Sequence, residues 1–363
     1  MTSVQRHRFT LLDGFRGTAS AIVLLFHVLQ HLGYNGIPYT SLAVDFFFML
    51  SGFVISFAYE DRLRAGDMSF RGFMRVRLVR LYPLAFLGIS AGIALGFLAV
   101  VMKGDVSAVD VTKAGILGLL LLPSYVFPQW STAYPFNMAS WSLTFELFTN
   151  VVFAAIIFRI SLRKLAVCVG VFAIGLVILA VVHHGIDSGY DQDNFFGGFV
   201  RVLFPFFAGV MLCRIRPATQ RVMPKQAWVM ALLFPLPLFL PLGYHGLICL
   251  PYLFVFFPVW IYVGSARIGG TALMRICKFL GAMSYPVFIL QDPILRLGEE
   301  FQRRHHLSLK GDIVFGLVMY LSVYGIAYAA RRLYDQPVRA WLRRRLTLTS
   351  TPTTHGPALA TGD

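Results

Sequence analysis

Charged side chains are scarce in this 363-residue chain, and their scarcity restricts its class. Asp, Glu, Lys and Arg make up 13% of the residues, whereas hydrophobic residues make up 57%. Because a soluble globular domain carries about 25% charged residues, this composition excludes an ordinary soluble protein and predicts a polytopic membrane protein. No soluble domain and no internal repeat is recognisable. We therefore expect one transmembrane domain over 1–345 and a disordered cytoplasmic tail over 346–363.

Cysteine is also rare, and the pattern of the few cysteines excludes the usual cysteine chemistry. The chain has four, far apart and in or at the ends of apolar segments: Cys168, Cys213, Cys249 and Cys277. No pair has the Cys-x-x-Cys spacing of a zinc or redox site. We interpret them as small buried hydrophobic residues, and we expect no metal site and no bound cofactor.

Acidic residues are too few to balance the basic ones, and the chain has no recognisable leader. There are 17 Asp and Glu against 32 Lys and Arg, which gives a formal net charge of +15. No basic helix carries base-reading residues, so we expect no nucleic-acid partner. The cations cluster in short loops instead, as the positive-inside rule predicts for a protein in a bilayer. No small-residue cleavage site follows the N-terminus, so the first apolar segment is expected to remain as a helix.

Long apolar segments, by contrast, recur along the chain. A membrane-spanning helix needs about 20 largely apolar residues. Ten segments approach or meet this length: 13–33, 42–59, 81–102, 141–158, 165–182, 196–213, 226–243, 246–264, 279–297 and 311–330. Another apolar segment, 114–127, is too short and predicts a re-entrant or interfacial element. The predicted fold class is all-α, with about ten transmembrane helices.

The cations also predict an orientation. With the N-terminus in the cytoplasm, ten crossings place nearly every cation-rich segment inside: 60–80, 159–164, 214–225, 265–278 and the tail. If 114–127 crossed as well, the later loops would change sides and this asymmetry would be lost. We therefore expect a multi-pass protein of the inner (plasma) membrane with both termini in the cytoplasm.

Polar residues within the apolar segments are candidate functional groups, because an ionisable group inside a bilayer is costly. Arg16 and His27 of the first segment are eleven positions apart, so they differ by about 20° around a helix and about 16 Å along it. Arg16 is then expected near the cytoplasmic end and His27 in the outer half of one face. Two alternatives stay open, a snorkelling Arg16 and a helix-packing His27. His31 is interpreted as interfacial.

Two carboxylates fall in the outer halves of predicted helices. Asp45 is expected to approach His27 across the loop 34–41, where it would orient the imidazole ring and stabilise its protonated form. The alternative for Asp45 is a charge that complements the helix dipole. Glu146 is expected either beside the reacting groups or in a structural pair with a neighbouring helix.

Other polar residues suggest contacts with ligands. Trp141 and Ser142 precede Glu146 at the predicted interface, where Trp often anchors a helix. Gln291 interrupts the segment 279–297, where it serves either helix packing or a site. Four arginines precede the third predicted helix: Arg71, Arg75, Arg77 and Arg80. Each is explained by the positive-inside rule, but as a group they can bind a phosphorylated ligand, because guanidinium binds phosphate in a bidentate manner.

Four stretches, taken together and in order, resemble the acyltransferase-3 family of integral membrane acyltransferases. They are "LDGFRGTASAIVLLFHV", "VDFFFMLSGFVIS", "RVRLVRLYPL" and "SWSLTFELFTN". The resemblance covers roughly 9–341. It implies transfer of an acyl group, expected to be acetyl, from cytoplasmic acyl-CoA to a hydroxyl of a cell-surface or secreted glycan.

The resemblance also implies roles for the candidate residues. His27, Asp45 and Glu146 would be catalytic. Arg16, Arg75, Arg77 and Arg80 would bind the donor, and Trp141, Ser142 and Gln291 would bind the acceptor or support the site. The distance from Arg16 to His27 suits the pantetheine arm of CoA, and His27 would act either as a general base or as the acyl carrier.

Two features depart from the family pattern. The stretch "SYPVFILQ" ends in Gln291 where the family often has His. Val76 stands four residues before Arg80, where the family often has an arginine, so Arg75 or Arg77 would take that place. An acyltransferase for a small metabolite or antibiotic remains an alternative. So does a transporter or flippase, although no paired Gly- or Pro-broken helices in matching halves support it.

Overall fold

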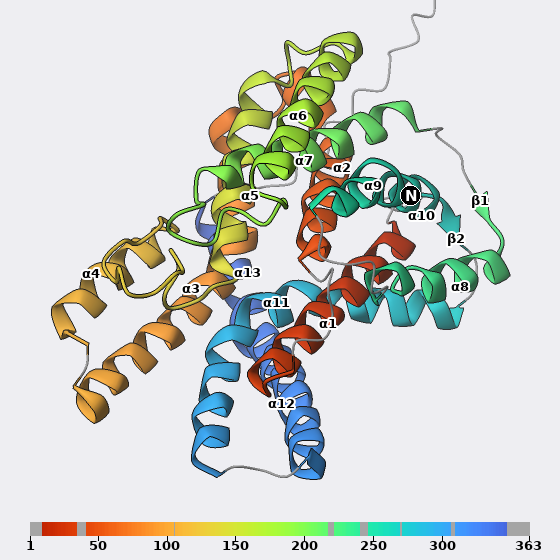
Figure 1. Ribbon diagram of the computed structural model, residues 1–363. Helices are drawn as coiled ribbons and strands as arrows, with labels where there is room; N and C mark the ends of the chain where they lie inside the picture. The colour runs from red at the N-terminus through yellow and green to blue at the C-terminus, as the bar shows by residue number, and fades with distance from the viewer. Residues whose placement is uncertain are drawn as a thin grey trace, which may run out of the picture.

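The computed structural model is a bundle of helices, drawn in Figure 1. The structure describes residues 9–34, 41–104, 106–216, 221–239, 246–268, 271–305 and 309–346. Within these ranges, seven helices are long and apolar enough to cross a membrane. Two shorter apolar helices, Ser140–Ile156 and Cys249–Gly264, accompany them. The predicted all-α, polytopic fold class is confirmed. All but the first residue of the predicted tail lies outside the described residues.

The described residues form mainly helices, with two strands of two residues each. The helices of the main bundle are α1 Thr10–His31, α2 Leu42–Arg64, α3 Phe70–Lys103, α5 Ser140–Ile156, α6 Leu162–Val182, α7 Gly197–Ile215, α11 Thr271–His305 and α12 Leu309–Ala330. The shorter elements are α4 Ala108–Leu119, β1 Arg221–Val222, α8 Pro224–Leu233, η1 Leu236–Phe239, η2 Gly246–Ile248, α9 Cys249–Pro251, η3 Tyr252–Phe256, α10 Phe257–Gly264, β2 Arg267–Ile268, η4 Arg331–Asp335 and α13 Gln336–Arg345.

One predicted helix is much shorter than expected. In place of 226–243, the structure has the ten-residue α8 and then the 3₁₀ turn η1. Pro235 and Pro237 follow α8 directly. Proline has no backbone N–H to donate to the preceding turn, and its ring clashes with the carbonyl four residues earlier, so an α-helix ends there. The segment is apolar, as predicted, but its closely spaced prolines prevent one long helix.

The segments predicted to be cytoplasmic gather at one end of the bundle. Arg64 and Arg214 both donate hydrogen bonds to the Ile160 carbonyl, at 2.7 and 3.1 Å. Strands β1 and β2 pair in parallel at Arg221–Arg267 and Val222–Ile268. Because Arg64 and Ile160 lie at the same end of the bundle, the chain between them must cross it an even number of times. Helices α3 and α5 account for two crossings, so α4 is not a third. This agrees with the prediction of a short, non-spanning element near 114–127.

Loops from two distant parts of the chain cover the end of the bundle opposite the segments predicted to be cytoplasmic. A β-bridge joins Thr132 to Asp191. The Gln192 side chain donates to the carbonyls of Phe127 and Trp130, each at 2.9 Å. These contacts fix the segment between α6 and α7 against the segment between α4 and α5.

Glycines let the helices around the site approach closely. A Cβ atom at Gly17 of α1 would overlap the backbone of Leu280 in α11, and one at Gly52 of α2 would overlap the Phe206 carbonyl in α7. Figure 1 shows α1 lying along α11, which changes direction along its length. Helix α11 contains Pro286 and Pro293, and proline within a helix produces such a bend.

Candidate active site

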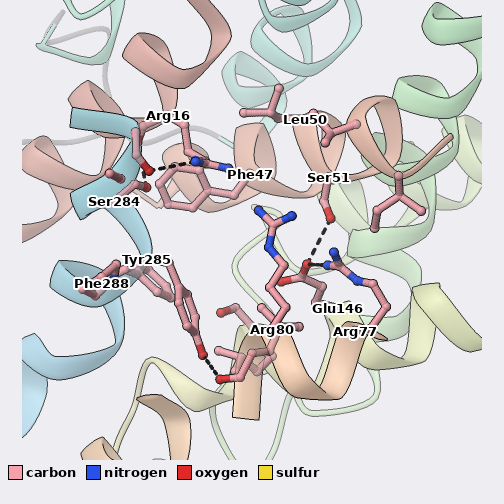
Figure 2. A pocket seen from close by; sticks show the side chains of 18 of the residues that line it. Arg16, Phe47, Leu50, Ser51, Arg77, Arg80, Glu146, Ser284, Tyr285 and Phe288 are labelled. Atoms are coloured by element: carbon pink, nitrogen blue, oxygen red, sulfur yellow. Dashed lines mark hydrogen bonds and ion pairs between the residues drawn. The ribbon is translucent and has the colours of Figure 1, made fainter. Parts of the chain in front are cut away.

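A cavity of about 410 Å³ lies among α1, α2, α3, α5, α11 and the C-terminal segment η4–α13. We call it the arginine cavity, because its charged lining consists of Arg16, Arg77, Arg80, Glu146, Arg331, Asp335, Arg339 and Arg343. Figure 2 shows the Arg80 guanidinium pointing into the space between Arg16 and Glu146. A second opening on the α1–α2 side has a volume of about 740 Å³ and shares Arg16 and Arg80 with it.

Arg16 is fixed to the neighbouring helix. Its guanidinium donates to the Gly281 carbonyl of α11 at 2.7 Å and to Asp13 at 3.2 Å. The Ser284 hydroxyl in turn donates to the Arg16 carbonyl at 3.1 Å. The side chain therefore lines the cavity with an orientation fixed by its contacts to α11 and to Asp13.

Arg77 forms the most buried ion pair of the arginine cavity. Its side chain is 3% exposed, and it donates to Glu146. Glu146 also accepts a hydrogen bond from Ser51 at 3.0 Å. Glu146 is therefore paired with a neighbouring helix, and it lies with the arginines and not in the cavity that contains His27.

Arg75 does not belong to this cavity. Its side chain is exposed and contributes nothing to the lining. Residues two positions apart on a helix differ by about 200° around its axis, whereas Arg77 and Arg80 differ by about 60°. The expectation that Arg75 shares the donor site is wrong, and Arg77 is the residue that accompanies Arg80.

A third cavity, of about 320 Å³, surrounds His27 near the other end of the bundle. We call it the histidine cavity; among its lining residues are His27, His31, Trp141, Gln291 and Asp292. The Nδ1 atom of His27 lies 3.4 Å from Oε1 of Gln30, and Nδ1 of His31 lies 3.2 Å from Glu299. Gln291 is 2% exposed, and within the described part of the chain its Oε1 accepts no hydrogen bond.

Asp45 is paired elsewhere, and this corrects a prediction. Both carboxylate oxygens accept from Arg201, at 2.9 and 2.8 Å, and both side chains are fully buried. Arg201 also lies 3.3 Å from Asp187. The expected pairing of Asp45 with His27 is wrong, because a guanidinium binds a carboxylate in a bidentate manner and occupies both oxygens. Arg201 was missed, although it is an isolated cation within the apolar segment 196–213.

Trp141 and Ser142 lie next to each other but line different cavities. Trp141 is 7% exposed and faces the histidine cavity, where the Arg201 guanidinium lies 5.2 Å from its ring centroid. It is therefore a buried residue and not an interfacial anchor. Ser142 lines the arginine cavity and donates to the Ala139 carbonyl at 2.9 Å.

The arginine and histidine cavities meet at an apolar partition. Val44 and Phe288 line both of them. The Phe288 ring also packs edge-on against Phe47, with 5.7 Å between centroids, and Phe47 lines the arginine cavity. Because all three side chains are apolar, no fixed ionic contact has to break for this partition to move. The two predicted functional ends of α1 thus open into adjoining cavities.

The loop between α6 and α7 contributes Asp187 and Tyr190 to the histidine cavity. In the same loop, burial raises the pKa of Asp191, and the nearby Asp193 raises it further. Within the described ranges, no group of three or more His, Cys, Asp or Glu side chains is placed to hold a metal ion.

Comparison with known proteins identifies the kind of protein that has this arrangement. A family model described as an acyltransferase domain matches residues 9–332. The chain belongs to the acyltransferase-3 family. This confirms the predicted acyltransferase class, and with it a transferase that uses an acyl donor.

Two curated proteins are similar to this family member. A protein from Komagataeibacter xylinus, named as membrane-bound transacylase BcsY, is 26% identical over 347 residues, covering 91% of this chain and 84% of that protein. Protein 2 in the picA locus of Rhizobium radiobacter is 32% identical over 191 residues, covering 50% of this chain and 98% of that protein. No solved structure matches the chain.

Proposed function

We propose that this membrane acyltransferase transfers an acyl group, acetyl in the first instance, from cytoplasmic acyl-CoA to a hydroxyl of a cell-surface or secreted glycan. The observation that carries the proposal is the pair of adjoining cavities, one rich in arginine and one containing His27. With the termini in the cytoplasm, the first cavity opens towards the donor and the second towards the acceptor.

The charge of the arginine cavity suits the phosphate groups of CoA. Among the described residues that line it, six are arginines and two are carboxylates. Arg77 is neutralised by Glu146 and Arg16 is paired with Asp13, while the Arg80 guanidinium points into the open space. Charge-assisted hydrogen bonds from guanidinium to phosphate are among the strongest available to a protein, so a polyanionic donor is favoured here over a neutral one.

The length of the donor matches the separation of the two cavities. Arg16 and His27 are eleven positions apart on α1, which is about 16 Å at 1.5 Å per residue. With its phosphates at the arginines, the donor would extend its pantetheine arm past Val44 and Phe288. The thioester would then lie in the histidine cavity, and the acyl group would never be released into the bilayer.

His27 is the residue proposed to perform the chemistry. As a general base it takes the proton of the acceptor hydroxyl while the oxygen attacks the thioester carbonyl. The carbon–sulfur bond then breaks, and the proton on His27 goes to the departing CoA thiolate. If His27 is instead the nucleophile, its ring nitrogen attacks the thioester carbonyl, the carbon–sulfur bond breaks and CoA leaves as the thiolate, which takes a proton. The acceptor hydroxyl then attacks the acyl-imidazole and loses its proton, and the carbon–nitrogen bond breaks to free His27. A labelled acyl group trapped on quenched protein, and absent in His27→Ala, would establish the second route.

The histidine cavity offers suitable groups for a hydroxylated acceptor. The Oε1 atom of Gln291 is buried and without a partner in the described structure, so it can accept a hydrogen bond from a hydroxyl. Asp292, which is paired with Arg296 at 2.9 Å, adds a carboxylate to the same wall. Trp141 and Tyr190 contribute aromatic surface, which combines an apolar face with a polar edge.

The decisive experiment measures release of the CoA thiol by the purified protein in lipid nanodiscs, with acetyl-CoA and a panel of glycan and small-molecule acceptors. His27→Ala is expected to abolish acceptor-dependent release while the protein still expresses and binds acetyl-CoA. His31→Ala is the matched control, because it removes an imidazole one turn away on the same helix. Full activity of His27→Ala would refute the assignment, and wild-type protein that neither binds nor consumes acyl-CoA would favour a transporter.

A further inference from the structure

The C-terminal segment η4–α13 contributes a regular row of charged side chains to the arginine cavity. Arg331, Asp335, Arg339 and Arg343 are spaced four residues apart, and all four line it. The family match ends at residue 332, so three of the four lie beyond it. Nothing in the family assignment therefore accounts for this row.

The local backbone explains how one segment keeps four side chains on one side. In an α-helix, each step of four residues rotates the side chain by about 40° around the helix axis relative to the one before. Here the stretch Arg331–Asp335 is a π-helical turn, which has more residues per turn and offsets that drift. Pro337 follows, where it removes a backbone donor and favours such a distortion.

From Asp335 onwards, the side chains of the row become more exposed towards its C-terminal end. Asp335 is 3% exposed and forms an ion pair with Nε of Arg339 at 2.7 Å, so this carboxylate is already neutralised. Arg343, one turn further, is exposed and forms no ion pair with any other described residue. By contrast, Arg77 at the inner side of the cavity is 3% exposed and paired with Glu146. Arg343 therefore lies at the mouth, available to a ligand.

We propose that this row, with Arg343 as its terminal member, binds the phosphomonoester at the far end of the donor. The inference rests on the proposed function, in which the donor thioester lies near His27 and its other end lies at the mouth of the arginine cavity. In CoA that far end carries a 3′-phosphate. A phosphomonoester has a charge of about −1.5 to −2 near neutral pH, which makes it the strongest single anion that the mouth can attract.

The test compares acetyl-CoA with its 3′-dephospho analogue in wild-type protein and in three variants. The readout is the ratio of the two donor KM values in the thiol-release assay, supported by binding in nanodiscs. Loss of one charged hydrogen bond to phosphate corresponds to roughly tenfold to a hundredfold in affinity. Wild-type protein is thus expected to prefer acetyl-CoA by at least about tenfold, and Arg343→Gln to lose most of that preference.

Arg344→Gln is the matched control, because it removes the same charge from the next position of the same helix, outside the cavity lining. Arg331→Gln gives a second, independent variant at the inner end of the row. The inference is overturned if wild-type protein does not distinguish the two donors, or if Arg343→Gln keeps the wild-type ratio. It is also overturned if Arg344→Gln loses as much, since a general surface charge would then explain the effect. Failure of the wild-type protein to bind or use acetyl-CoA at all would instead refute the proposed function itself.

Discussion

Removing Arg201 is expected to destabilise this protein strongly, and the magnitude follows from its surroundings. Arg201 and Asp45 are both fully buried and joined by two hydrogen bonds, and Asp187 lies on the other side of the guanidinium at 3.3 Å. Removing one partner of a buried ion pair costs about 3–5 kcal/mol, because the remaining charge has no water to solvate it. Arg201→Met leaves two carboxylates facing each other, so we expect a loss at the upper end of that range.

The double variant Asp45→Leu/Arg201→Met provides the contrast. Replacing both members of a buried pair by apolar residues of similar size is often neutral, so most of the lost stability should return. Apparent unfolding temperatures of the purified variants in one detergent would measure this. A single-variant loss below about 1 kcal/mol, the range of an exposed ion pair, would refute the reasoning, because it would mean that water reaches the site. Equal losses in the single and double variants would also refute it.

Further variants test separate parts of the site. Arg80→Gln should raise the donor KM about tenfold or more, whereas the exposed Arg75→Gln should leave it unchanged; equal effects would contradict the face assignment. Phe288→Ala should allow longer acyl-CoA donors to react, and an unaltered chain-length profile in the thiol-release assay would count against the partition. Asp191→Asn should raise the unfolding temperature at pH 7. Because burial raises the folded pKa of Asp191, its ionisation costs stability as pH rises from the ordinary carboxyl range towards that raised pKa, so the gain should vanish towards pH 4.

The sequence predicted the fold class well because length and apolarity are local properties. The apolar segments mark the main helices, and the cation-rich loops mark one end of the bundle, which Arg64, Ile160 and Arg214 then join. The segment 226–243 was the exception, because closely spaced prolines end a helix whatever its hydropathy.

The site was predicted only where its geometry lies within one helix. Arg16 and His27 share a face of α1 by simple rotation, and they do open into adjoining cavities. The predicted pairing of Asp45 with His27 was wrong because the partner of Asp45, Arg201, comes from α7. Nothing local to either residue predicts which helices meet. The same limit applies to Glu146, whose position depends on where α3 packs against α5. The row ending at Arg343 was missed for a different reason, since its cations were attributed only to the positive-inside rule.

The apolar partition of Val44, Phe47 and Phe288 has a consequence for the membrane itself. Two polar cavities aligned across a bilayer would form a pore if they joined, and protons and ions would leak through it. A short apolar constriction excludes water and so insulates the two compartments. A donor arm bound in the constriction would itself block the passage of water and ions. Under the proposed topology, this constriction would keep the donor and acceptor cavities from forming a continuous water-filled path.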